Sequence, residues 1–272
     1  MATYVNNWTK YSGVWTKTQQ MQGEAAGTWS TPRPLLYTWG DNGDGQAGLS
    51  DQIKRSSPTQ VGSLTNWLQI SGGERQSAAI KTNGTLWTWG GNSYGVLGSN
   101  NSNSSSSPTQ VGALTTWSKI ALGSTNPNSA LAVRTDGTLW AWGYNYHGTL
   151  GTNDRTAYSS PVQIGSGTNW ASVFVGSDNS YALKSDGTLW GWGYNQGGGQ
   201  LGRNDKVARS SPVQIGSGNT WLTMSGGSLH LNAVRSDNSL WCIGSNNFGQ
   251  LGLDNGAFDT SSPTQVGALT NW

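Results

Sequence analysis

Short alternations of apolar and polar residues, separated by turn residues, run along almost the whole chain. In one stretch the run 78–81 (Ala-Ala-Ile-Lys) leads through a turn at Asn83-Gly84 into the run 86–89 (Leu-Trp-Thr-Trp). Two extended runs joined by Asn-Gly are the strongest short-range hairpin signal, because glycine tolerates a positive φ. The pattern predicts β-hairpins throughout, and only residues 16–26 carry a trace of helical periodicity. Equivalent turns recur at Asp136-Gly137, Asp186-Gly187 and Asp237-Asn238.

A block reading Leu-Trp-x-Trp-Gly-x-Asn-x-x-Gly-x-Leu-Gly marks each hairpin unit. It begins at Leu86, Leu139 and Leu189, with variant copies at Leu36 and Leu240. A Ser-Pro pair and a further Trp follow each copy, and successive copies lie about fifty residues apart, which is the signature of a repeat architecture. We therefore expect a segment outside the repeat, 1–34, followed by a repeat domain, 35–272. Its units are expected near 35–66, 67–116, 117–169, 170–220 and 221–272.

Three or four short strands per unit, marked by Trp and Gly, predict the blades of an all-β propeller with five or six blades. Alternation along Leu86–Trp89 places both Trp rings on one face of the strand, so each blade presents large rings to one neighbour. A last strand is expected at each Pro-Thr/Val-Gln-Val/Ile-Gly run, with Pro at its entry, where no ladder donor is needed. A β-solenoid is the alternative fold, but its coils are usually shorter than these units.

The full unit reads Trp-x-x-Ile-x-x-Gly, Ala-Leu/Val, Asp-Gly-x-Leu-Trp-x-Trp-Gly-x-Asn-x-x-Gly-x-Leu-Gly, Ser-Pro-x-x-Val. It resembles the repeat of the regulator of chromosome condensation (RCC1) family over roughly residues 35–272. The resemblance implies a β-propeller with four-stranded blades. The family often carries His three residues before the Ala of the second strand. Here that position holds Gln76, Ser129, Asn179 and His230.

Residues 1–34 carry a different signature, Asn-Trp-Thr-Lys-Tyr-Ser-Gly-Val-Trp-Thr at 7–16, followed by Gln-Gln at 19–20 and Ala-Gly-Thr-Trp at 26–29. This arrangement is similar to a short motif in virion proteins of marine bacteriophages, where it precedes Trp-Gly repeats. The resemblance implies a phage structural or tail-appendage protein located in the virion. We expect its aromatic residues to dock onto neighbouring proteins or to close the ring. These residues are Trp8, Tyr11, Trp15 and Trp29.

The first unit lacks the strands that precede its hairpin. We expect residues 3–16 to pair with this incomplete blade and close the ring. The alternative is an open ring, or one completed by another copy, whose exposed edges would invite pairing with a second chain.

Most of the 16 Trp are expected to be structural, although aromatic faces also stack on sugars. All but three fall in positions that every unit repeats, and burying such rings stabilises a fold by roughly 25 cal/mol per Å². Only Trp8, Trp15 and Trp29 lie outside these positions. The repeat core is predicted to contain Trp39, Trp67, Trp87, Trp89, Trp117, Trp140, Trp142, Trp170, Trp190, Trp192, Trp221 and Trp241.

Only 10% of the residues are charged, and the formal net charge is +2. Acidic and basic residues share the same loops, so no basic stripe offers a surface to a nucleic-acid backbone. Cys242 is the single cysteine, which excludes an intrachain disulfide. No apolar run reaches transmembrane length, and no signal peptide is expected at Met1. We therefore expect neither a nucleic-acid partner nor membrane insertion.

The sequence contains little that indicates a catalytic site or a metal site. His147 and His230 stand in different units without a nucleophile motif, and the carboxylates show no paired general-acid arrangement. The run 41–45 (Asp-Asn-Gly-Asp-Gly) resembles the start of a calcium loop, but Gln52 replaces the bidentate Glu. We expect no enzyme activity, no metal and no cofactor.

Functional variation is expected where the copies disagree, in the loops that follow each block. Corresponding loops emerge on one face of a propeller, so their aromatic tips would form a composite surface. The alternative is that these loops are solvated turns free to vary. The surface candidates are Tyr94, Tyr144, Tyr146, His147, Tyr194 and Phe248.

The leading functional hypothesis is a non-enzymatic virion protein that serves in assembly or in host attachment. Its partners would be other virion proteins, itself, or a host receptor protein or glycan. The second hypothesis is a soluble or secreted propeller of the lectin or inhibitor type. The third is what the family resemblance implies, nucleotide exchange on a small GTPase, but neither an acidic face nor a basic tail is evident.

Overall fold

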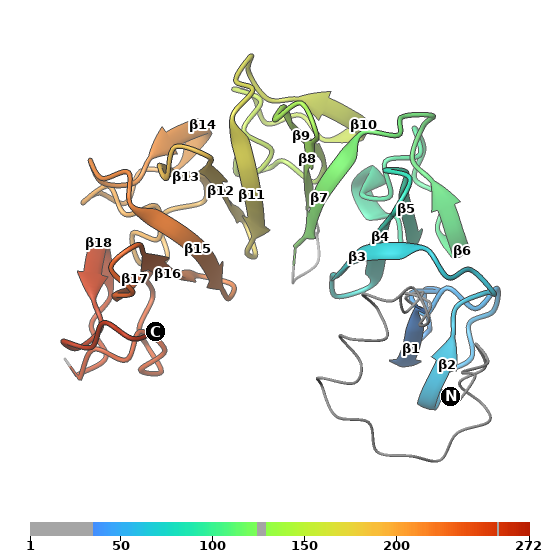
Figure 1. Ribbon diagram of the computed structural model, residues 1–272, viewed down its shortest axis with the longest axis horizontal. Helices are drawn as coiled ribbons and strands as arrows, with labels where there is room; N and C mark the ends of the chain where they lie inside the picture. Colours follow the sequence, from blue (N-terminus) through green and yellow to red (C-terminus); the bar gives the residue numbers. More distant parts are fainter. Residues whose placement is uncertain (1–34, 124–128, 255) are drawn as a thin grey trace, which may run out of the picture.

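The computed structural model describes residues 35–123, 129–254 and 256–272, and these residues form 18 strands in five antiparallel sheets. The sheets follow one another along an arc, as the blades of a propeller do (Figure 1). Strands β3, β7, β11 and β15 lie on the inner side of the arc, and the last strand of each sheet lies outside (Figure 1). The expected all-β propeller class is confirmed.

The first sheet has two strands and each of the other four has four, in chain order. The first contains β1 (Tyr37–Gly40) and β2 (Arg55–Gln60). The second contains β3 (Trp67–Gly72), β4 (Gln76–Lys81), β5 (Leu86–Gly90) and β6 (Ser105–Gln110). The third contains β7 (Trp117–Leu122), β8 (Ser129–Arg134), β9 (Leu139–Gly143) and β10 (Tyr158–Gln163). The fourth contains β11 (Trp170–Val175), β12 (Asn179–Lys184), β13 (Leu189–Gly193) and β14 (Arg209–Gln214). The fifth contains β15 (Trp221–Gly226), β16 (His230–Arg235), β17 (Leu240–Gly244) and β18 (Thr260–Gln265).

The predicted hairpin turns join the second and third strands of each complete sheet. Gly137 has φ +76°, and Asn238 takes the equivalent left-handed conformation with φ 59°. The turn also packs closely, because a Cβ atom at Gly137 would lie 2.0 Å from the carbonyl oxygen of Thr168. Glycine is therefore needed at position 137 both for its backbone conformation and for its lack of a side chain.

Gly137→Ala should lower the free energy of unfolding by about 3 kcal/mol, since left-handed strain of about 1–2 kcal/mol adds to a backbone clash. Gly165→Ala is the matched control, because Gly165 also has a positive φ but a Cβ atom there would meet nothing within 4 Å. The free energy of unfolding of the control variant should fall by only about 1 kcal/mol. Urea unfolding followed by circular dichroism measures both, and equal losses would contradict the close packing of this turn.

The outer strands correct one detail of the sequence expectation. Pro108 lies inside β6 and not at its entry, and the pairing of β5 with β6 shifts register between Thr88↔Thr109 and Gly90↔Ser105. Since β6 is an edge strand with an irregular ladder at this point, the missing N–H of proline leaves no bond unmade.

Neighbouring sheets are held together by apolar clusters between their faces. Between the second and third sheets, Ile80 and Val111 pack with Trp117, Ile120 and Trp142. The second block Trp of each complete sheet but the last also donates its indole N–H to a carbonyl in the loop that joins the last two strands of the preceding sheet. These bonds are Trp89 to Gln46 at 2.9 Å, Trp142 to Val96 at 2.8 Å and Trp192 to Thr149 at 2.8 Å.

Trp39 is the exception among the predicted core residues. It occupies the same block position as Trp89, yet its side chain is 63% exposed, whereas Trp89 is 3% exposed. The reason is that no strand of the described residues lies before the first sheet to cover it (Figure 1). The predicted ring closure by residues 3–16 lies outside the described residues. Within the described residues, no helix has the length and apolar character needed to cross a membrane.

Candidate functional site

Five aromatic side chains from three neighbouring blades form a continuous row on one face of the propeller. They lie in the loops that follow β5, β9 and β13, the third strands of the second, third and fourth sheets. The ring centroids of Tyr94 and Tyr144 are 5.0 Å apart, and those of Tyr144 and Tyr146 are 6.4 Å apart. His147 continues the row, 5.0 Å from Tyr146 and 4.9 Å from Tyr194. We call these five residues the aromatic row.

The row is accessible to a partner. Tyr94 is 54% exposed and Tyr146 is 63% exposed, while Tyr144, His147 and Tyr194 are half-buried. Tyr94 is also held at φ 59°, within the short 3-10 turn at Ser93–Gly95. Large exposed rings in mutual contact therefore form a surface whose shape is set before any partner binds.

A buried Asn of the repeat fixes each loop that carries the row. The side-chain oxygen of Asn145 accepts the backbone N–H of Leu150 at 2.9 Å, and its amide donates to the carbonyl of Thr156 at 2.9 Å. Asn92 and Asn195 make the same bond to the backbone N–H of the leucine in their own blocks. Because Tyr144 and Tyr146 flank Asn145, we expect this anchor to position both rings.

Asp178 adds a carboxylate to the row. It precedes β12, and its backbone carbonyl accepts the N–H of Tyr194 at 2.7 Å. Burial raises the pKa of the Asp178 carboxyl, and the electrostatic interaction with His147 opposes that shift. Burial also raises the pKa of the Tyr144 hydroxyl, with a further contribution from Asp178. A half-buried carboxylate thus lies close to Tyr144 and His147, two members of the row.

The structure brings together five of the six surface residues expected from the sequence. Phe248, from the corresponding loop of the last blade, is 94% exposed and makes no ring contact with the row within the described residues. Asp178 was not among the candidates. The signal that could have found it is the disagreement of the repeat at this position, where Arg75 and Leu229 stand in the second and fifth sheets. Trp8, Tyr11, Trp15 and Trp29 lie outside the described residues.

In the loop that resembles a calcium site, the first carboxylate is paired with neighbouring side chains. Asp41 forms an ion pair with Lys54 at 3.0 Å and accepts a hydrogen bond from Gln46 at 3.1 Å. The hydrogen bond from Lys54 is the main reason that the pKa of Asp41 is lowered. Within the part of the chain that the structure describes, no group of three or more His, Cys, Asp or Glu is placed to hold a metal ion.

The fold resembles those of several solved propellers. Human WBSCR16 has a TM-score of 0.74 at 22% identity, with 87% of this chain and 63% of that chain covered. Yeast RCC1 (Prp20), in a structure where it is bound to Kap60, has a TM-score of 0.73 at 21% identity, with coverages of 86% and 57%. This chain therefore spans about six tenths of the length of these two structures.

A family model agrees with the structural resemblance. No curated protein sequence matches the chain. The model described as the regulator of chromosome condensation (RCC1) repeat matches residues 35–80, 83–126, 136–183 and 186–234, which is more than half of the sequence. A second model of the same description matches residues 67–96, 117–149 and 170–199. The chain belongs to the RCC1 repeat family.

Proposed function

We propose that this chain is a non-enzymatic binding protein of a bacteriophage particle, and that it contacts a host surface protein or glycan through the aromatic row. The observation that carries the binding role is the row itself, five touching rings with two of them more than half exposed. Exposed aromatic clusters of this kind are typical of the residues that dominate binding energies.

The architecture supports a binding role because it preorganises the surface. The rings come from three blades whose interfaces are closely packed, so a partner would order few additional side chains. Asp178 supplies an acceptor among the rings, which favours partners that present hydroxyl, amide or cationic groups. Yeast RCC1 (Prp20), which has a similar fold, is bound to Kap60 in its structure, so a protein that contains this fold takes part in a protein complex.

Two features support the virion setting. The motif at residues 7–29 resembles one in virion proteins of marine bacteriophages, where it precedes Trp-Gly repeats of this kind. The chain is also poor in charge and rich in Trp, a composition common in extracellular and virion β proteins. In this proposal residues 1–34 attach the propeller to other virion proteins, and the aromatic row faces outwards.

Phage particles that carry the double substitution Tyr146→Ala and Tyr194→Ala should adsorb to their host at least tenfold more slowly than parental particles. Each ring is expected to contribute about 1–2 kcal/mol to the free energy of binding. Loss of both rings should therefore weaken binding by at least tenfold, since about 1.4 kcal/mol corresponds to a factor of ten. Tyr37→Ala is the control, because Tyr37 is 46% exposed but lies on β1, outside the row.

Adsorption is measured by counting free particles over time, and mass spectrometry of purified particles shows whether the chain is incorporated. Parental adsorption by the double variant would contradict the role of the row. A chain that is absent from purified particles, but binds isolated glycans or proteins through the same rings, would instead identify a secreted binding propeller.

A further inference from the structure

A groove recurs between adjacent blades, at the end of the sheets opposite to the aromatic row. It lies beside the start of the inner strand, near the turn that joins the second and third strands. We number the grooves in chain order. The first groove lies between the first and second sheets, the second between the second and third sheets, and the third between the third and fourth sheets. Each contains the Trp that begins the inner strand, which is Trp67, Trp117 or Trp170.

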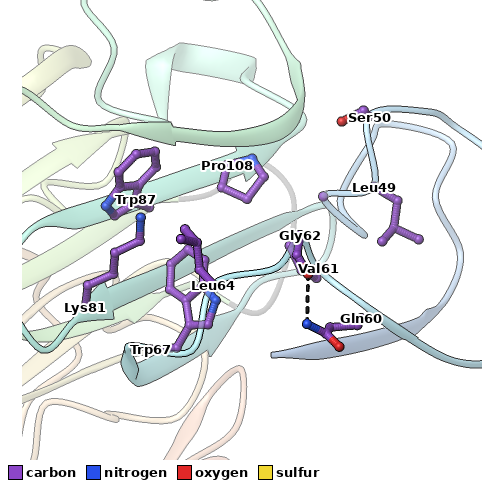
Figure 2. Close-up of a pocket in the computed structure, with 11 residues that line it drawn as sticks. Leu49, Ser50, Gln60, Val61, Gly62, Leu64, Trp67, Lys81, Trp87 and Pro108 are labelled. Carbon is purple, nitrogen blue, oxygen red and sulfur yellow. Dashed lines mark hydrogen bonds between the residues drawn. The ribbon is translucent and has the colours of Figure 1, made fainter. Parts of the chain in front are cut away.

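The grooves are large enough for a small ligand. Their volumes are about 340 Å³ for the first, 510 Å³ for the second and 570 Å³ for the third, within the range of small-molecule sites. Figure 2 shows the first groove, with Trp67, Lys81 and Trp87 on one side and Gln60, Val61 and Gly62 on the other. Leu64 and Leu114 line the first and second grooves, whereas Gly167 takes their place in the third.

The Trp that lines each groove has a buried indole N–H that makes no hydrogen bond within the described residues. Trp67, Trp117 and Trp170 are 4%, 2% and 7% exposed, and their Nε1 atoms have no partner within the described residues. In the third groove, the Nε1 atom of Trp170 lies 3.2 Å from the position of a Cβ atom on Gly167, which is part of the groove wall. A buried donor without an acceptor is unfavourable by roughly 1–3 kcal/mol, so a ligand that accepts this bond would recover that free energy.

Two of the grooves also hold a lysine that forms no ion pair within the described residues. The Lys81 ammonium is 3.4 Å from the ring centroid of Trp87 and 4.8 Å from that of Trp67, and the residue is only 5% exposed (Figure 2). Lys184 has the same arrangement in the third groove, at 4.7 Å from Trp170 and 4.4 Å from Trp190. No acidic residue is among the described residues that line either groove.

The second groove differs in charge. Its equivalent basic residue, Arg134, donates to Thr116 at 2.8 Å, lies 3.6 Å from the Asp136 carboxylate and does not line the groove. A basic residue over the Trp rings is therefore a structural feature of the repeat, and its cation–π contacts explain why it recurs. Those contacts do not satisfy the indole donor. Within the described residues neither the Lys81 nor the Lys184 ammonium forms an ion pair, although the Asp186 carboxylate, which does not line the third groove, is close enough to Lys184 for an electrostatic interaction.

We propose that the first and third grooves each bind a carboxylate carried on a compact ring. The carboxylate would accept the indole N–H of Trp67 or Trp170 and pair with Lys81 or Lys184, while the ring would lie against the apolar walls that include Pro108 or Pro212. A uronic acid and an aromatic acid share this chemistry. The inference does not depend on the aromatic row, which lies at the other end of the blades.

Isothermal titration of the full chain with sodium glucuronate and with sodium benzoate tests the proposal, with glucose as the neutral sugar. At least one of the carboxylates should bind with a stoichiometry of two per chain, and glucose should bind at least tenfold more weakly, because it lacks the charge-assisted bond. A response to glucuronate alone identifies a sugar site, and a response to benzoate alone identifies an aromatic-acid site.

Substitutions then assign the sites. Lys81→Met keeps an unbranched side chain and should reduce the stoichiometry from two to one, as should Lys184→Met, while Arg134→Met should leave it at two. Trp67→Phe keeps the ring but removes the donor, and should weaken the first site by about tenfold. Circular dichroism verifies that each variant is folded. Binding that survives both lysine substitutions, equal binding of glucose, or no binding of either carboxylate would overturn the proposal.

Discussion

Trp142→Ala should lower the free energy of unfolding by about 3–5 kcal/mol, the range expected when a fully buried Trp is truncated. Trp142 is 0% exposed, lies between the second and third sheets, and packs its ring 6.1 Å from that of Trp117. The substitution removes this volume and also leaves the carbonyl of Val96 without the indole donor at 2.8 Å. Both losses act on the same interface between blades.

Trp39→Ala is the control that isolates the effect of burial. Trp39 holds the same position in its block, but it is 63% exposed. Its substitution should change the free energy of unfolding by no more than about 0.5 kcal/mol, as for most surface residues. Urea unfolding followed by far-ultraviolet circular dichroism compares the two variants without relying on Trp fluorescence.

Hydrogen exchange shows where the loss occurs, since blades contact only their neighbours and a repeat protein can open in parts. In the Trp142→Ala variant, faster exchange should be concentrated in β8 and in the strands of the second sheet that face it. If Trp142→Ala lowers the free energy of unfolding as little as Trp39→Ala does, the interface between the second and third sheets does not hold these blades together.

The blades could be predicted from the sequence because their determinants are local. The hairpin turn at Asp136-Gly137 and the alternation along Leu139–Gly143 are properties of a few adjacent residues, and the structure realises both. The aromatic row could be predicted in part for a geometric reason. Equivalent loops of a propeller emerge on one face, so residues that differ among the copies at these loops come together.

Features that depend on neighbouring blades could not be predicted in this way. Trp39 and Trp89 are the same residue at the same repeat position, but Trp89 lies in a four-stranded sheet with another sheet before it. Trp39 lies in a two-stranded sheet that no other sheet of the described residues precedes. Asp178 joins the row through electrostatic interactions with Tyr144 and His147, which lie in a loop of another sheet, and no local pattern encodes this proximity.

Asn145→Ala is the second substitution with a large expected effect, a loss of about 3 kcal/mol or more in the free energy of unfolding. Its side chain is buried, and removing it leaves the N–H of Leu150 and the carbonyl of Thr156 without partners, at about 1–3 kcal/mol for each buried group. Asn153→Gly is the control, because Asn153 is exposed in the same loop and glycine tolerates its φ of 65°.

Asn145→Asp separates the hydrogen bonds from the shape of the side chain. A carboxylate at this position would lie against the Asp154 carboxylate, which now accepts the Asn145 amide at 3.0 Å. Repulsion and burial would raise the pKa of the new carboxyl in the folded state, so the variant should be least stable at neutral pH and recover part of the loss as the pH falls. A loss that is independent of pH would contradict this arrangement.

The same anchor links stability to binding, because Tyr144 and Tyr146 flank Asn145 in the chain. If the buried amide positions the aromatic row, Asn145→Ala should weaken partner binding at temperatures where the variant is still fully folded, and Asn153→Gly should not. If binding is lost only as the variant unfolds, Asn145 contributes to stability alone and the rings are positioned by their contacts with one another.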